Sequence, residues 1–163
     1  MARLRALVAG AIALAASSAA ADPIALPNTR ATLTIESGWT ALPASPRLVV
    51  AFKGPGGATL AVTRAQVPNP DAWRAKTREA YLDQVERGIA ASIRGYRKLA
   101  KRTGDVHDVP FLDVEARRED GATIVVRMLL FRTYALGLAI EVPKRTDAAG
   151  ARAIAKSFQP PKS

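Results

Sequence analysis

The sequence lacks cysteine altogether and has a single histidine, His107, and these absences exclude several kinds of site. Without cysteine the chain has no disulfide, no thiolate nucleophile and no lipid-modified cysteine. Metal sites need several Cys, His or clustered acidic ligands, and the sequence offers none at useful spacing. A Ser-His-Asp triad would depend on His107, and no Gly-x-Ser-x-Gly elbow presents a serine. We therefore predict no cofactor, no metal site, no catalytic residue and no enzymatic activity.

Acidic residues are in the minority, with 14 Asp and Glu against 24 Lys and Arg and a formal net charge of +10. Such an excess favours contact with anionic surfaces, such as lipid headgroups or acidic proteins, and says nothing about the fold. A compositional bias of the coding sequence explains the frequent arginine and alanine equally well.

No apolar run reaches the roughly 20 residues that a membrane-spanning helix needs. The longest one follows Arg3 and Arg5 and ends in small residues at Ala21, which is the pattern of a secretory signal peptide. We predict a signal peptide over residues 1–21, cleaved after Ala21, with retention as an uncleaved anchor as the alternative. The processed protein would be periplasmic or secreted, without a transmembrane helix, and its net charge would fall from +10 to +8 because two arginines leave with the leader.

The remaining chain fits one domain. We expect a flexible start over residues 22–29, a single folded domain over 30–160 and a short tail over 161–163. Alternating or continuous apolar patterns predict strands. They lie near residues 30–35, 46–52, 58–66, 95–103, 111–118, 123–132 and 134–142. Short turns are expected at Gly104-Asp105, at Glu119-Asp120-Gly121 and at Thr133. Tight turns between successive strands require an antiparallel sheet.

Two helices interrupt this pattern. The segment that begins at Asn69-Pro70-Asp71 has helix-start residues and an apolar stripe at helical spacing as far as about residue 93. A shorter helix is predicted to start at a Thr146 cap and to end before Pro160. Its apolar face consists of Ala151, Ile154, Ala155 and Phe158. The class is therefore α+β, with helices packed on a curved antiparallel sheet of about six to seven strands.

The last strand separates large residues from small ones. Tyr134, Leu136, Leu138, Ile140 and Val142 face one way, and Ala135, Gly137 and Ala139 face the other. Small residues allow a helix to approach closely, so we expect both faces of this strand to be covered.

The segment from Val106 to Asp120 carries His107 and two carboxylates, Asp113 and Glu115. Strand alternation places both carboxylates on one face, where Arg127 of the next strand can reach them. We interpret this face as solvated, with cross-strand ion pairs. A metal site or an acid–base pair is the alternative, but the neighbouring arginines would repel a cation. His107 is expected in a turn.

A basic segment surrounds Tyr96 and is the one feature with functional promise. It consists of Arg94, Arg97, Lys98, Lys101 and Arg102. On an edge strand these charges would deter aggregation between sheets. The alternative is a patch that binds anionic lipid or an acidic protein. We expect no binding to nucleic acid, since a lone tyrosine makes a poor stacking platform.

The order of these parts resembles the family that groups PsbP-type photosystem accessory proteins, a Ran-binding nuclear import factor and the bacterial periplasmic DcrB-like proteins. The motifs behind the resemblance are Gly38-Trp39, the turn before Phe111, the Tyr134 strand and the Phe158 helix. The resemblance covers roughly residues 31–160 and implies an α/β/α sandwich that acts by docking to other proteins. The family pattern has a glycine where this chain has Val109 before Pro110, and no partner-binding residue carries across. The predicted leader favours the bacterial periplasmic branch.

The leading hypothesis is a non-enzymatic exported domain that binds a protein or envelope component with the rim of its sheet and its positive surface. One alternative is a periplasmic carrier that holds an apolar small ligand between helix and sheet, beneath Trp73 and Tyr81. A third, weaker alternative is an enzyme of unrecognised type.

Overall fold

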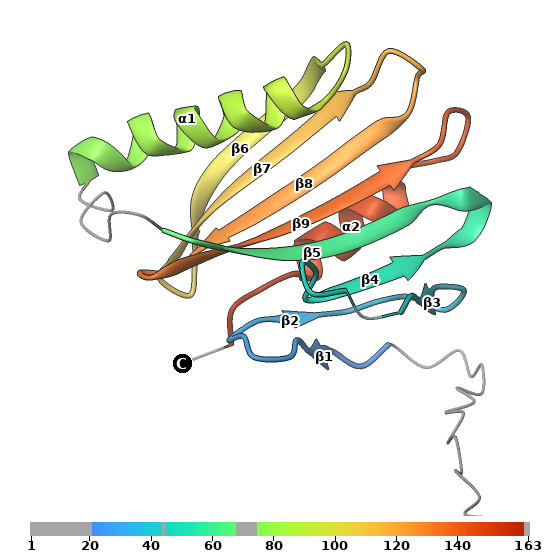
Figure 1. Cartoon of the computed structure of the whole chain (residues 1–163), viewed down its shortest axis with the longest axis horizontal. Coiled ribbons are helices and arrows are strands. Elements are labelled where there is room, and N and C mark those ends of the chain that lie inside the picture. Colours follow the sequence, from blue (N-terminus) through green and yellow to red (C-terminus); the bar gives the residue numbers. More distant parts are fainter. Residues whose placement is uncertain (1–20, 44, 68–74, 162–163) are drawn as a thin grey trace, which may run out of the picture.

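A seven-stranded antiparallel sheet forms the centre of the computed structural model, which describes residues 21–43, 45–67 and 75–161 (Figure 1). Its strands, in spatial order, are β3 (Thr40–Ala41), β4 (Val50–Lys53), β5 (Thr59–Gln66), β9 (Tyr134–Val142), β8 (Thr123–Leu130), β7 (Val109–Arg117) and β6 (Arg97–Val106). The helices are α1 (Ala75–Ser92) and α2 (Ala149–Ser157), with a short 3-10 turn, η1 (Pro55–Gly57). The predicted α+β class and antiparallel sheet are confirmed.

The two helices lie on opposite faces of the sheet, and each covers its own core (Figure 1). The face that α2 covers collects the large residues of β9, such as Leu138 and Ile140, together with Ile154 and Phe158 of the α2 segment. The face that α1 covers collects smaller clusters from β7 and β8 around Leu82. This arrangement is the α/β/α sandwich that the resemblance implied.

Strands β6 to β9 form a meander with tight turns. At the β7–β8 turn, Gly121 has a φ of 88°, and the Ala122 amide donates a 3.0 Å hydrogen bond to Asp120 Oδ1. The β6–β7 turn was expected at Gly104-Asp105, but β6 continues to Val106 and the turn falls at His107 and Asp108. Both residues have positive φ, 47° and 62°, as a two-residue hairpin turn requires.

The start of α2 also differs from the sequence-based expectation. The helix begins at Ala149, its N-cap residue is Ala148, and Thr146 does not cap it. Instead, Asp147 Oδ1 accepts a 3.0 Å hydrogen bond from the Ala149 amide, because a short carboxylate can reach an amide two residues ahead. The expected apolar contacts of this helix are confirmed, since Ala151, Ile154 and Phe158 are all buried. The expected Asn69 cap of α1 lies outside the described residues.

The segment 22–29 contains a short strand and one buried side chain. Ile24–Ala25 forms β1, which pairs with β2 (Thr32–Leu33) in a small second sheet, and Leu26 is buried. Strand β2 is held against the α2 segment through the Thr32 and Gln159 bridge. The predicted signal peptide over residues 1–21 lies outside the described residues except for Ala21.

Helix α1 covers only part of its face of the sheet. Its apolar residues pack against β7 and β8, and on β9 only Ala135 joins that core. Ala139 is exposed and Gly137 is half-buried, so the prediction that both faces of β9 are covered is wrong for that stretch. No helix within the described residues has the length and apolarity to cross a membrane.

Candidate functional site

The carboxylates singled out from the sequence do not form a solvated face. Arg127 lies below α2 with its side chain 4% exposed, and its Nε atom is 3.0 Å from Asp113 Oδ1. Its Nη1 atom donates hydrogen bonds of 3.1 and 3.0 Å to the carbonyl oxygens of Ala155 and Lys156, and its guanidinium lies 4.6 Å from the centre of the Phe111 ring. The predicted cross-strand pair between Asp113 and Arg127 is therefore confirmed, but it holds the end of α2 and is not a surface feature.

Glu115 pairs with a different arginine from the one expected. It accepts hydrogen bonds of 2.9 and 2.8 Å from Nε and Nη2 of Arg152, which belongs to α2. These bonds are the main reason why the pKa of Glu115 lies below its ordinary value. The interpretation of a wetted strand face is wrong here, because α2 approaches closely enough to supply the partner of this carboxylate.

His107 does not join these carboxylates. Its Nδ1 atom lies 3.3 Å from the carbonyl oxygen of Pro160, in the segment that follows α2. In the part of the chain that the structure describes, no three residues among His, Asp and Glu come together as a group that can hold a metal ion.

The basic segment is divided between the two faces of the sheet. A bulge between Lys98 and Ala100 shifts the register of β6 against β7, so Lys98 and Lys101 both point toward α1. Their Nζ atoms each lie 2.7 Å from a carboxylate oxygen of Glu86, and Lys101 is also 2.6 Å from Asp83. The Glu86 side chain is 12% exposed, and its pKa is lowered mainly by hydrogen bonds from Lys101 and Lys98. These two lysines hold α1 on the sheet.

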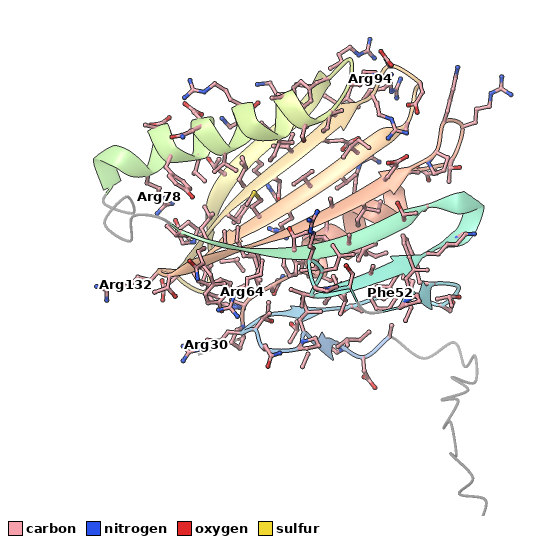
Figure 2. All side chains as sticks on the ribbon, in the orientation of Figure 1. Arg30, Phe52, Arg64, Arg78, Arg94 and Arg132 are labelled. Carbon is pink, nitrogen blue, oxygen red and sulfur yellow. The ribbon has the colours of Figure 1, made fainter. Side chains whose placement is uncertain are left out.

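The other cations of the segment remain at the surface. Arg94 lies at the turn after α1, at the edge of the molecule (Figure 2), 3.6 Å from Glu119. Arg102 is 61% exposed and its Nη2 atom is 2.9 Å from Asp113 Oδ2. Arg97 stands directly opposite Arg117 in the β6–β7 ladder, and no salt bridge joins either of them to an acidic residue in the described ranges.

We call Arg97, Arg102 and Arg117 the cationic margin. The β6–β7 register places the three on the α2 side of the sheet, at its β6 edge. A groove of about 460 Å³ lies beside the margin, with Ala100 and Val125 in its wall and Arg152 and Lys156 contributed by α2. Asp113 and Glu115 also line the groove, where they pair with Arg102 and Arg152, so its charged side chains are of both signs around a small apolar area.

A second, larger hollow lies on the other face, where α1 leaves the sheet open. It measures about 710 Å³ and has small residues, Ala51, Ala61 and Ala139, in its lining. At one end Arg118 bridges two carboxylates, with Nη2 2.6 Å from Asp120 Oδ2 and 2.7 Å from Glu141 Oε1. The Arg118 hydrogen bond is the main cause that lowers the pKa of Asp120 to about 2. The hollow is thus lined by apolar residues at its centre. At its end the positive and negative side chains nearly cancel each other's charge.

Comparison with known proteins relates this chain to others through its fold. No family model matches the sequence, and no curated protein matches it. Among solved structures, the solution structure of cyanobacterial PsbP (CyanoP) from Synechocystis sp. PCC 6803 superposes with a TM-score of 0.59 at 13% identity. The match covers 91% of this chain and 98% of that one.

A second similar structure is a crystal structure from Bacteroides thetaiotaomicron VPI-5482. It superposes with a TM-score of 0.53 at 10% identity, over 89% of this chain and 50% of that one. These likenesses show a PsbP-like fold, as the sequence resemblance suggested.

Proposed function

We propose that this protein is an exported, non-enzymatic binding domain whose cationic margin recognises an anionic protein or envelope component. The observation that supports this most is the placement of Arg97 directly opposite Arg117 without a salt bridge among the described residues. Like charges in cross-strand register destabilise a sheet, and an anion placed between them would remove that cost. The predicted leader over residues 1–21 supports export, and the resemblance to docking proteins supports a binding role.

The structure also decides which cations are suitable for a test. Lys98 and Lys101 bond to Glu86, so their substitution would loosen α1 and confuse binding with stability. Arg97 and Arg117 are exposed, and neither forms a salt bridge in the described ranges. The charge of Arg117 contributes to lowering the pKa of Glu115, but reversal of the two exposed charges should affect folding less than loss of the lysine bonds to Glu86.

We expect the double variant Arg97→Glu, Arg117→Glu to bind anionic probes much more weakly than the wild type. The probes are vesicles that contain phosphatidylglycerol and a poly-glutamate chain, each measured at low and at physiological salt. A basic residue near an anionic surface contributes about 1 kcal/mol, so the loss of two lowers retention by about 30-fold.

The matched control is Arg47→Glu, Lys53→Glu, which makes the same change of net charge near the opposite edge of the sheet. The control should retain most of the binding. Equal losses in the two double variants would show that net charge alone governs binding, and the margin would then have no special role.

The open hollow around Ala139 favours a second candidate, the carrier of an apolar small ligand. The small-residue stretch of β9 on this face is covered by no helix among the described residues, and Ala61 and Ala139 are cross-strand partners on its floor. The ligand position was expected beneath Trp73 and Tyr81. Trp73 lies outside the described residues, and Tyr81 packs against the core under α1 and does not line this hollow.

If the hollow holds a ligand, the wild type will bind a neutral fluorescent lipid analogue, and Ala139→Trp will abolish that binding by filling the floor. Ala41→Trp, an exposed strand residue outside the lining, is the matched control and should bind as the wild type does. Absence of binding by the wild type, or equal binding by both variants, would rule out the carrier.

A further inference from the structure

The two edges of the main sheet are very different. One edge strand, β3, is only 2 residues long, whereas the other, β6, has 10 residues. On its inner side β6 pairs with β7 over its whole length, and on its outer side no strand of the described chain pairs with it. The residues from Arg97 to Thr103 are all exposed. This outer side therefore offers unpaired backbone N–H and C=O groups, which is the template for strand addition.

The side chains of β6 decide which kind of strand can be added. A second copy of β6 laid alongside would bring arginine and lysine rows together, so the edge disfavours pairing between two copies of this chain. The same row attracts a strand that carries carboxylates. The exposed cations therefore disfavour pairing between two copies of β6 and favour pairing with an acidic strand.

The bulge fixes where the carboxylates of such a strand belong. Lys98 and Lys101 already have Glu86 and Asp83 as partners on the α1 side. On the α2 side, Arg97 has no salt bridge within the described residues, and Arg102 is 61% exposed beside Asp113. Acidic residues at alternate positions of an added strand would all face this second side.

An apolar contact is available at the same edge. Leu99, at the bulge, is 41% exposed and is one of three large hydrophobic residues that the described chain exposes. From Ala100 to Val106 the register with β7 is regular, so the backbone N–H and C=O groups on the outer side of this stretch are regularly spaced. Backbone pairing, charge and one apolar contact thus occur together along one strand.

We infer that β6 binds an extended, acidic segment of a partner protein as an additional strand of the sheet. The inference rests on the proposed function and specifies its partner and mode of binding. Backbone hydrogen bonds would position the segment, and its alternate carboxylates would meet Arg97 and Arg102.

Synthetic peptides as long as β6 test this. The first alternates Glu with Thr or Val. Two further peptides have the same sequence but carry N-methyl groups on one or the other alternate set of backbone amides. Only one set of amides can point toward β6, so one N-methylated peptide should lose binding by at least about tenfold while the other binds nearly as well as the parent.

Protein variants complete the experiment. Arg97→Glu should weaken the binding of the parent peptide by about tenfold. Arg47→Glu, at the far edge, should leave this binding unchanged. A peptide with Lys in place of Glu should not bind. In hydrogen exchange, the parent peptide should protect amides of β6 that are unprotected in the free protein.

The outcomes separate the inference from the function on which it rests. If both N-methylated peptides bind as the parent does, the contact is purely electrostatic, and strand addition is wrong while an anion-binding margin stands. If no peptide binds but the margin still retains the protein on phosphatidylglycerol vesicles, the partner is a membrane surface and the inference is overturned. If substitution of Arg97 changes neither the binding of peptides nor the retention of the protein on vesicles, both proposals fail.

Discussion

Replacing Phe158 by alanine is expected to lower the free energy of unfolding by about 4 kcal/mol. Phe158 is 0% exposed and lies where the end of α2 meets the core beneath the sheet. The loss combines the transfer free energy of the ring with the cost of the cavity left behind. Because the residue follows α2 directly, the variant should also detach this helix from the sheet.

Chemical denaturation of the wild type and the variant measures this effect. Phe158→Leu fills part of the space and should recover a substantial part of the loss. Leu99→Ala, at an exposed position, should change stability by no more than about 0.5 kcal/mol. A loss below about 1 kcal/mol in Phe158→Ala would contradict the central place of this side chain in the core.

Replacing Arg127 by methionine is expected to cost about 3 kcal/mol, although it substitutes an apolar residue in a buried place. The change removes the guanidinium donor from the carbonyl oxygens of Ala155 and Lys156 and removes the buried partner of Asp113. The two carbonyl oxygens keep one donor each, from the Phe158 amide and the Gln159 side chain. Arg102 still neutralises Asp113 from the exposed side, so the cost should lie at the lower end of the range for a broken buried pair. Loss of the guanidinium–Phe111 contact adds a small amount.

The control for this variant is Arg102→Met, which removes the exposed arginine from the same carboxylate. Since exposed pairs contribute at most about 1 kcal/mol, we expect only a small change. Hydrogen exchange gives a second readout, because the Phe158 amide donates to the Ala155 carbonyl at the same helix end. In Arg127→Met this amide should exchange faster. Equal stability of the two variants would show that Arg127 does not hold α2.

Much of the sheet could be predicted because its alternation is strong. In β7 and β9 the residues alternate between the two faces as the pattern indicates, and the Asp120-Gly121 turn joins the strands as expected. Other features left no such signal. The extent of α1 over the sheet could not be predicted, because small residues such as Ala139 leave room for a helix without showing whether one is there.

The charged residues were harder to place. Arg152 lies 37 positions from Glu115 along the chain, and nothing in a strand pattern points to a partner on a helix that far away. The bulge in β6 occurs in a segment where Leu99 and Ala100 stand between basic residues, so no alternation of apolar and polar residues indicates which way each one faces. The cations were therefore recognised as a group, while their division between two faces required the three-dimensional arrangement.

Because of that bulge, one short segment both attaches α1 to the sheet through its lysines and exposes arginines on the other side. If β6 ran through Leu99 in plain alternation, Lys98 and Lys101 would lie three positions apart and point to opposite sides, so that only one of them could still reach Glu86. The bulge thus compensates for the odd spacing of the two lysines. Removal of Leu99 would leave the lysines two positions apart and again on one side, so this deletion should preserve both bonds to Glu86.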